Sequence, residues 1–127
     1  MTTAQIVLYL LLMVVAVFYL RKLILGRGIQ QYDASSASTE LAERHDVLFL
    51  DVRSAAERSR NKIPGSVHIP LQELKGRIPE LERHRNKEII CYCASGSRSL
   101  SAAFLLKRNG YRTANLAGGI SSWKLGV

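Results

Sequence analysis

The start of the chain carries no charged side chain up to Leu20, and this feature limits the possible folds of the 127 residues more than any other. Residues 6–20 (IVLYLLLMVVAVFYL) form an uninterrupted apolar or aromatic run. A helix that crosses the hydrocarbon of a bilayer needs about 20 largely apolar residues. Residues 4–25 supply that length if the two cations within them extend their charged ends to the lipid headgroups. We therefore predict a transmembrane anchor over residues 1–25.

Two other interpretations of this run agree less well with the sequence. A cleaved secretory signal has positive charge before its apolar core and a cleavage site soon after it. Here Arg21, Lys22 and Arg27 follow the core, and a Ser-x-Ala pattern at residues 35–37 lies far beyond it. A buried core helix would carry polar residues on one face, and this run has none.

The basic residues that follow the span predict on which side the rest of the chain lies. Such residues favour the cytoplasmic side of a membrane. We expect a single-pass protein of the inner (cytoplasmic) membrane with its remaining chain on the cytoplasmic side, which agrees with free thiols at Cys91 and Cys93. Residues 26–37 (GRGIQQYDASSA) lack apolar periodicity and predict a flexible linker that reaches up to roughly 40 Å.

Residues 38–127 are predicted to form one α/β domain. Residues 47–52 and 88–92 are short, nearly continuous apolar runs, typical of strands that are covered on both faces. Residues 67–69 and 111–116 predict further strands, and a helix from about Arg98 to Asn109 precedes Gly110. Alternating strands and helices favour a mostly parallel central sheet with helices on both faces.

One loop of this domain has the composition of an anion-binding site. The segment CASGSRS leaves a predicted strand and enters a predicted helix, where open α/β sheets bind ligands. Four small residues separate Cys93 from Arg98, so the loop can curl until its backbone N–H groups point inward around an anion. The positive end of the helix dipole adds to this effect. The residues predicted to bind substrate are Ala94, Ser95, Gly96, Ser97, Arg98 and Ser99.

Cys93 is the predicted catalytic nucleophile of this loop. Inward-pointing N–H groups stabilise a thiolate and lower the thiol pKa from about 8.5. Arg98 adds a permanent positive charge that holds an anionic substrate or the thiolate itself. Because the cradle already favours the thiolate, this chemistry needs no histidine base, no metal ion and no organic cofactor.

Four sequence blocks together resemble the rhodanese-like domain, and the membrane-anchored, single-domain bacterial forms look most similar. The blocks occur in the order of that family and cover essentially all of residues 38–127. They are LDVR at 50–53, IPGSVHIP at 63–70, Cys93-x-x-Gly96-x-Arg98-Ser99, and Leu116-x-Gly118-Gly119-x-x-x-Trp123.

The resemblance implies a fold and an activity. The fold is a sheet of about five strands flanked by helices. The activity is sulfur transfer, in which the thiolate of Cys93 takes a sulfane sulfur from a donor such as thiosulfate, becomes a persulfide and passes the sulfur to a thiophilic acceptor. The backbone N–H groups of residues 94–98 would then hold the persulfide. The implied partners are a small anionic donor, a thiol or protein acceptor, and the membrane.

Two other functions fit the sequence less well. A phosphatase variant of this fold has five residues between its Cys and Arg because phosphate needs a wider ring, and here there are four. A non-catalytic interaction module at the membrane would not need to keep a thiol in an anion cradle. Nucleic acid is disfavoured as a partner despite the net charge of +8, because no basic stripe with interleaved aromatic residues is present.

Several residues near these blocks have a predicted structural role. Asp51 and Arg53 are expected to end a strand near the site and to support it as an ion pair rather than as catalysts. Cys91 is interpreted as a small apolar core residue, with a resolving thiol that receives the sulfur as the alternative. His68 is interpreted as a structural histidine and Trp123 as a packing anchor.

Overall fold

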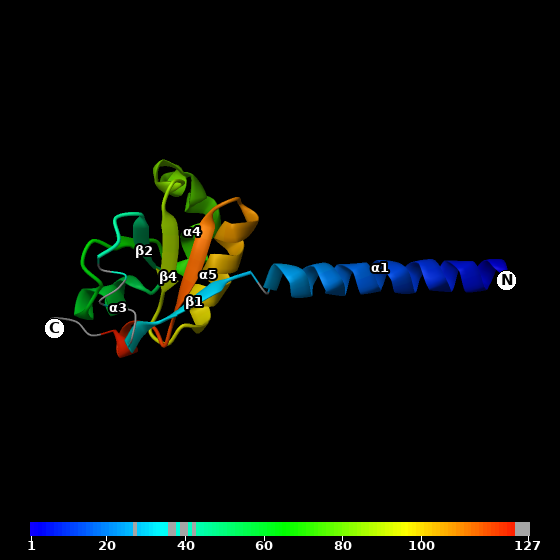
Figure 1. Ribbon diagram of the computed structural model, residues 1–127, viewed down its shortest axis with the longest axis horizontal. Coiled ribbons are helices and arrows are strands. Elements are labelled where there is room, and N and C mark those ends of the chain that lie inside the picture. Colours follow the sequence, from blue (N-terminus) through cyan, green and yellow to red (C-terminus); the bar gives the residue numbers. More distant parts are fainter. Residues whose placement is uncertain (27, 36–37, 39–40, 42, 124–127) are drawn as a thin grey trace.

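The computed structural model describes all residues except 27, 36–37, 39–40, 42 and 124–127. Its first element, α1 (Thr3–Gly26), projects from the rest of the chain as a single rod (Figure 1). The segment Thr3–Arg21 has a mean hydropathy of 2.3, is wholly unburied, and is long and apolar enough to cross a membrane. Since this helix packs against no core, the structure excludes a buried core helix.

A five-stranded sheet forms the centre of the domain, in the order β1-β5-β4-β2-β3. Every neighbouring pair of strands is parallel. The predicted α/β class with a parallel sheet of about five strands is therefore confirmed. The strands are β1 (Gln30–Asp33), β2 (Val47–Asp51), β3 (Val67–His68), β4 (Glu88–Tyr92) and β5 (Arg112–Ala117).

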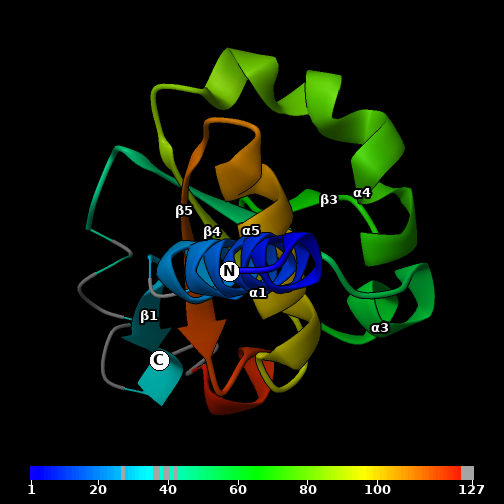
Figure 2. The same ribbon diagram turned by 90° about the vertical axis from the view of Figure 1, so that its right-hand side faces the viewer.

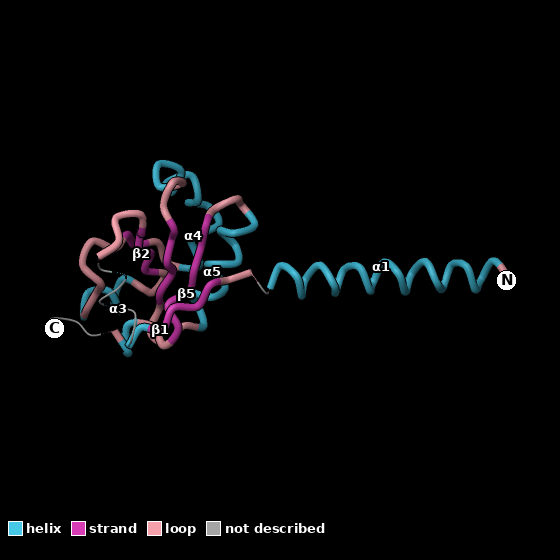
Figure 3. Tube along the Cα trace, in the orientation of Figure 1, coloured by secondary structure: helices cyan, strands magenta, loops and turns pink. Residues whose placement is uncertain are grey.

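Short helices connect the strands and cover the sheet (Figure 3). A capping box begins the first of them, because the Ser54 hydroxyl accepts from the Glu57 N–H and the Glu57 carboxylate accepts from the Ser54 N–H. The helices are α3 (Ala55–Arg60), α4 (Leu71–Arg77), the 3-10 helix η1 (Ile78–His84), α5 (Ser97–Arg108) and the 3-10 helix η2 (Ile120–Ser122).

The sheet has an apolar core on each of its faces. Successive side chains of a strand point to opposite faces, so Ile89 and Cys91 of β4 join one core while Ile90 and Tyr92 join the other. The first core is covered by α4 and α5 and the second by η2 and the segments around Ala34 and Leu41. Burial on both faces explains why the central strands read as continuous apolar runs.

The prediction of a flexible linker over residues 26–37 is wrong for four residues, because Gln30–Asp33 form β1 and pair with β5. The Tyr32 hydroxyl donates to the Glu88 carboxylate over 2.6 Å, which fixes this strand further. A short edge strand with polar side chains has no apolar periodicity, so the sequence pattern could not reveal it. Residues 36–37 of the predicted linker lie outside the described residues.

Because all strands run the same way, their N-terminal ends lie along one side of the sheet and their C-terminal ends along the opposite side. We call the edge at which the strands begin the strand-start edge, and the edge at which they finish the strand-end edge. The six residues of β5 separate the two edges by about 17 Å at roughly 3.3 Å per residue. Ligands of parallel sheets bind at the strand-end edge.

Candidate active site

Cys93 lies at the strand-end edge, directly after β4 and before the loop that leads into α5. Its sulfur accepts a hydrogen bond from the Gly96 N–H over 3.0 Å and lies 3.4 Å from the Ser99 hydroxyl. The residue has no exposed surface. The structure therefore brings the predicted nucleophile and two predicted loop residues together, and it buries the thiol.

The pKa of the Cys93 thiol lies below its ordinary value as the result of two opposing effects. Burial raises the pKa, because a thiolate is costly to remove from water. Hydrogen bonds from the Ser99 hydroxyl and from the backbone N–H groups of Ser99, Gly96 and Ser95 lower it and outweigh burial. The loop thus stabilises an anionic sulfur without a neighbouring histidine.

A turn that follows β5 keeps the N–H groups of the loop directed at the sulfur. The Cys93 carbonyl accepts from the Ile120 N–H over 2.9 Å, and the Ala94 carbonyl accepts from the Ser121 hydroxyl over 2.8 Å. Because both carbonyls are bound from outside, the loop cannot turn them toward the thiolate. Gly119, at φ +62°, lies so close to these two carbonyls that a Cβ would overlap them.

Asn115 of β5 supports the loop from below. Its side-chain amide donates to the Gly96 carbonyl over 3.1 Å, and its Oδ1 accepts from the Ser99 hydroxyl over 2.5 Å. Ser99 has one hydroxyl proton and two acceptors, Asn115 Oδ1 and the Cys93 sulfur. When Cys93 ionises, that proton can turn from the amide to the sulfur. Sequence reasoning missed Asn115, whose one signal is a polar residue inside an otherwise buried strand.

Arg98, predicted to hold the donor or the thiolate, is bound to a carboxylate of the same chain. Its guanidinium donates two hydrogen bonds to Glu57 over 2.7 and 2.8 Å. These bonds hold the pKa of Glu57 at about 2, although partial burial opposes them. The guanidinium also interacts with the Cys93 sulfur, which contributes to raising the pKa of Arg98. The ion pair joins α3 to the start of α5, directly after the loop that holds Cys93.

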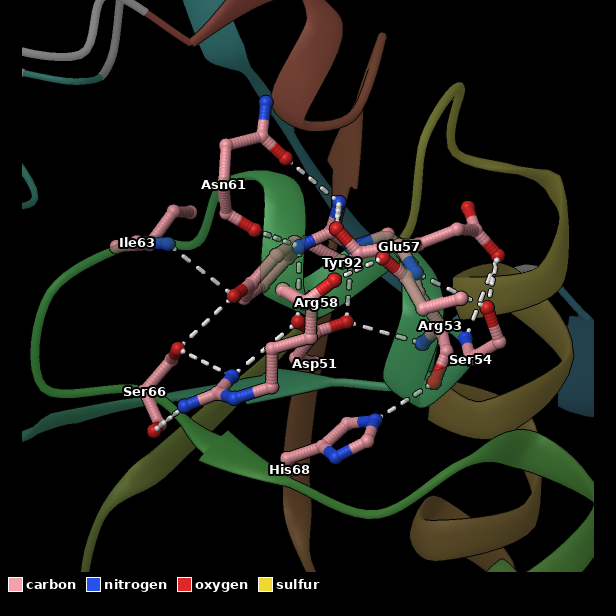
Figure 4. Close-up of polar contacts among 12 residues, drawn as sticks. Asp51, Arg53, Ser54, Glu57, Arg58, Asn61, Ile63, Ser66, His68 and Tyr92 are labelled. Carbon is pink, nitrogen blue, oxygen red and sulfur yellow. Dashed lines mark hydrogen bonds and ion pairs between the residues drawn. The ribbon is translucent and has the colours of Figure 1, made fainter.

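Asp51 and Arg53 lie behind the loop in a buried polar network (Figure 4). Arg53 binds Asp51 through its Nε and Nη2 atoms over 3.0 and 2.9 Å and donates to the Asn61 carbonyl over 2.6 Å. Its guanidinium also lies 5.5 Å from the ring centroid of Tyr92, the residue before the nucleophile. Burial raises the pKa of Asp51, but the bonds from Arg53 outweigh it, so the pKa lies below its ordinary value. This geometry favours a supporting role over a catalytic one.

The other predicted loop residues take different positions. Ser95 is exposed and directs its N–H toward the sulfur, whereas the contacts of Ala94 are made by its carbonyl. Ser97 is exposed and begins α5. The Gly96 backbone has a φ of +107°, a left-handed conformation that glycine adopts readily.

Three residues with predicted structural roles occupy such positions. Cys91 is wholly buried in the first core, and burial raises its pKa far above the ordinary value, which favours the core interpretation over a resolving thiol. The His68 ring lies 2.7 Å from the Arg53 carbonyl. Trp123 packs edge-on against Phe49 at a centroid distance of 5.3 Å.

Comparisons with known proteins agree with this geometry. The sequence profile of the rhodanese-like domain matches residues 33–125. A sulfurtransferase of Allochromatium vinosum is 36% identical over 96 residues, which cover 75% of this chain and 88% of that protein. The structure of a rhodanese-related protein from Thermoplasma volcanium matches with a TM-score of 0.66 at 31% identity, covering 74% of this chain and 89% of that one. A possible tyrosine phosphatase of unknown function from Rhodopseudomonas palustris matches with a TM-score of 0.69 at 28% identity, covering 78% and 82%.

Proposed function

The chain belongs to the rhodanese-like domain family, and on that premise we propose that it is a membrane-anchored sulfurtransferase that carries sulfur as a persulfide on Cys93. The family relationship supports sulfur transfer in general. The proposal for this residue rests on one observation, the buried Cys93 sulfur that accepts hydrogen bonds within its own loop and has a lowered pKa. A lowered pKa increases the fraction of Cys93 that is thiolate, and the thiolate is the nucleophilic form of cysteine.

The first half-reaction loads the enzyme. The Cys93 thiolate attacks the outer sulfur of thiosulfate, a new S–S bond forms, and the S–S bond of thiosulfate breaks. Sulfite leaves with the electron pair of the broken bond, and Cys93 becomes a persulfide with a terminal negative charge. We expect the N–H groups of Ser95 and Gly96, which interact with the Cys93 sulfur in the resting state, to stabilise that charge and to give the loop the role of an oxyanion hole for sulfur.

The second half-reaction returns the enzyme to its starting state. A thiolate or cyanide attacks the terminal sulfur of the persulfide, and the bond between that sulfur and the Cys93 sulfur breaks. The electron pair of that bond regenerates the Cys93 thiolate, so no external oxidant or reductant is consumed. The same hydrogen bonds that lower the pKa of Cys93 make it a good leaving group in this step.

Binding of an anionic donor requires Arg98 to change partners. Its side chain and that of Glu57 are 38% and 30% exposed, so water screens their ion pair and separation costs little. A donor dianion can take the place of the carboxylate beside Arg98. Because Arg98 also interacts with the buried sulfur, this exchange would bring the donor toward Cys93.

Anchoring is a second part of the proposal. The unburied apolar helix α1 supports a single membrane span over residues 1–25, and the basic residues after it support an inner-membrane protein with residues 38–127 on the cytoplasmic side. Residues 27–29 then remain between α1 and β1. Protease treatment of right-side-out and inverted membrane vesicles tests this orientation, because the domain should be digested only in the inverted ones.

Persulfide formation is the experiment that tests the catalytic proposal. After thiosulfate treatment, the full-length protein should gain the mass of one sulfur atom, and cyanide should remove it. The Cys93→Ser variant should gain none, whereas the Cys91→Ala variant, a matched control two residues earlier in β4, should behave like the parent. If Cys93→Ser takes up sulfur as well as the parent, Cys93 is not the carrier.

Two alternatives give different results in the same preparation. A phosphatase would hydrolyse a generic aryl phosphate. The four-residue spacing between Cys93 and Arg98 argues against this activity. A non-catalytic interaction module would show no turnover with thiosulfate, mercaptopyruvate or a protein persulfide, and no persulfide on the purified protein.

A further inference from the structure

The strand-start edge carries a dense group of cations that the proposed reaction does not use. Residues 82–87 and 107–112 contain six Lys or Arg residues and one acidic residue, Glu82. Both segments border the starts of β4 and β5. We call this group the basic edge; it consists of Arg83, Arg85, Lys87, Lys107, Arg108 and Arg112.

Most of this charge is not neutralised within the described part of the chain. Arg85 binds Glu82 over 2.8 Å, and it is the one member of the basic edge with an ion pair to a described carboxylate. Arg83, Arg108 and Arg112 are exposed, and the two lysines are partly exposed. Arg112 donates a hydrogen bond to the Asn86 carbonyl and makes no ion pair with any described residue, although its charge also acts on the Asp46 carboxylate, which Arg44 binds.

The basic edge lies where the chain enters the domain from α1. Gln30, the first residue of β1, pairs with Ala114 near the start of β5, and Ile29 packs against the first core. The Lys107 ammonium lies so close to Gly28 that a Cβ there would overlap it. Figure 2, which looks along α1 toward the domain, has the helix in front of α5.

The short connection holds the basic edge near the membrane. Only three residues separate Gly26, the last of α1, from Gln30, so the two lie at most about 14 Å apart. The helix rises about 8 Å from Arg21, the first cation after the apolar run, to Gly26. Together these lengths allow at most about 22 Å between Arg21 and Gln30. An anionic surface acts over a screening length of about 8 Å at physiological salt, so the domain must lie closer than this upper limit for its cations to be attracted.

We propose that the basic edge binds the anionic headgroups of the membrane in which α1 is anchored, and that it holds the opposite, strand-end edge toward the water. The inference rests on the anchoring part of the proposed function and is independent of the sulfur chemistry. Its consequence for catalysis is that the loop around the buried Cys93 faces away from the bilayer, at the opposite ends of the strands. The sulfur donor and acceptor are then water-soluble partners rather than lipid-dissolved ones.

Two other roles account for these cations less well. Lys107 and Arg108 stand in the last turn of α5, where they also compensate the helix dipole, but that role involves no lipid. Nucleic acid would need exposed aromatic residues for stacking, and Tyr111, the aromatic residue within these segments, is buried at 4% exposure beneath Arg85.

Amine footprinting of the full chain tests the proposal with its own lysines. The protein is placed in nanodiscs of phosphatidylcholine alone, or of phosphatidylcholine and phosphatidylglycerol in equal parts, and is acylated and mapped by mass spectrometry. Lys87 and Lys107 should react about threefold more slowly or less in the anionic discs, and high salt should remove the difference. Lys62 and Lys75, both exposed and outside the basic edge, should react equally in both discs.

The outcomes separate the proposals. Arg108→Gln with Arg112→Gln should lessen the protection of Lys107 in anionic discs, while Arg60→Gln, an exposed control, should not; unfolding would expose all lysines in both discs. Equal reactivity of Lys87 and Lys107 in the two lipids overturns the inference, as does their protection by added transfer RNA alone. A chain that does not remain in the discs contradicts membrane anchoring. A loss of sulfur transfer would bear neither on anchoring nor on headgroup binding by the basic edge.

Discussion

The two edges of the sheet use positive charge in opposite ways. At the strand-end edge, Arg53 and Arg58 both bind Asp51, and Arg98 binds Glu57. At the strand-start edge, five of the six cations of the basic edge have no ion pair to a described carboxylate. Carboxylates of the same chain neutralise the arginines of the site, so these arginines hold neighbouring segments in place. The proposed role of the opposite edge is to present its charge to an external partner.

The difference follows from burial. Asp51 and Arg53 are almost wholly buried, and a charge removed from water must be paired or hydrogen-bonded. The cations of the basic edge keep contact with water and need no partner within the chain. Substitutions at the two edges should therefore differ in size and in kind.

The largest effect on stability is expected for Asp51→Ala. The substitution leaves Arg53 buried without its carboxylate, which should lower the free energy of unfolding by about 3–5 kcal/mol. Asp46→Ala is the control at the strand-start edge, because the Arg44–Asp46 pair is half exposed and should cost at most about 1 kcal/mol. Urea unfolding of both variants in detergent measures the difference, and equal losses would contradict the contrast between the edges.

Gly119→Ala should damage the site through its backbone. A Cβ at this position overlaps the Cys93 and Ala94 carbonyls and strains a left-handed residue, so we expect a loss of about 1–3 kcal/mol in stability. The displaced loop should also lower kcat/KM for thiosulfate by about 10- to 100-fold, because misplaced groups catalyse poorly.

Gly65→Ala separates these two effects. Gly65 has a similar φ of +79°, but a Cβ there meets nothing within 4 Å. This variant should lose stability alone and keep its kcat/KM. If both variants lose activity to the same extent, the turn after β5 does not position the catalytic loop.

The elements that the sequence predicted share a physical property. The strands β2 and β4 are buried on both faces, so the sequence shows them as continuous apolar runs that can be recognised as strands. β1 could not be predicted in this way, because it is an outermost strand whose largely exposed polar side chains show no apolar periodicity. The linker estimate of roughly 40 Å was too long for the same reason, which places the domain nearer to the end of α1.

The loop between β4 and α5 could be singled out from the sequence for a different reason. Local spacing fixes it, because Cys93, the small residues and Arg98 lie within six consecutive positions. The contacts of Arg98 with Glu57 and of Ser99 with Asn115 join residues that are 41 and 16 positions apart. No local pattern encodes such pairs, so neither the arginine's partner nor the burial of the thiol could be read from the chain.

Ser99→Ala should shift the pH dependence of the thiol without breaking the fold. A hydroxyl that bonds the thiolate lowers the Cys93 pKa, so its removal should raise the midpoint of alkylation by iodoacetamide by about one pH unit. Thiolate forms as pH rises through the pKa, so at a given neutral pH the variant should react more slowly. Ser97→Ala, at the exposed start of α5, should leave the midpoint unchanged.

The same variant has a consequence for stability. Because the folded-state pKa of Cys93 is depressed, its ionisation stabilises the fold above the unfolded value, and this contribution is lost as pH falls through the folded value. In Ser99→Ala, the gain in stability between these two pH values should shrink. An unchanged alkylation midpoint would show that the backbone N–H groups alone hold the thiolate.

The smallest effect is expected for Glu57→Gln, and its sign is what tests the exchange of partners by Arg98. If Glu57 competes with the donor, an uncharged amide should lower KM for thiosulfate about two- to fivefold, since a partly exposed pair is worth about 0.2–1 kcal/mol. Glu73→Gln, in the exposed pair with Arg77, should leave KM unchanged. A higher KM would mean that Glu57 positions Arg98 for the donor. The Arg98–Glu57 ion pair would then persist during turnover as it does in the resting state.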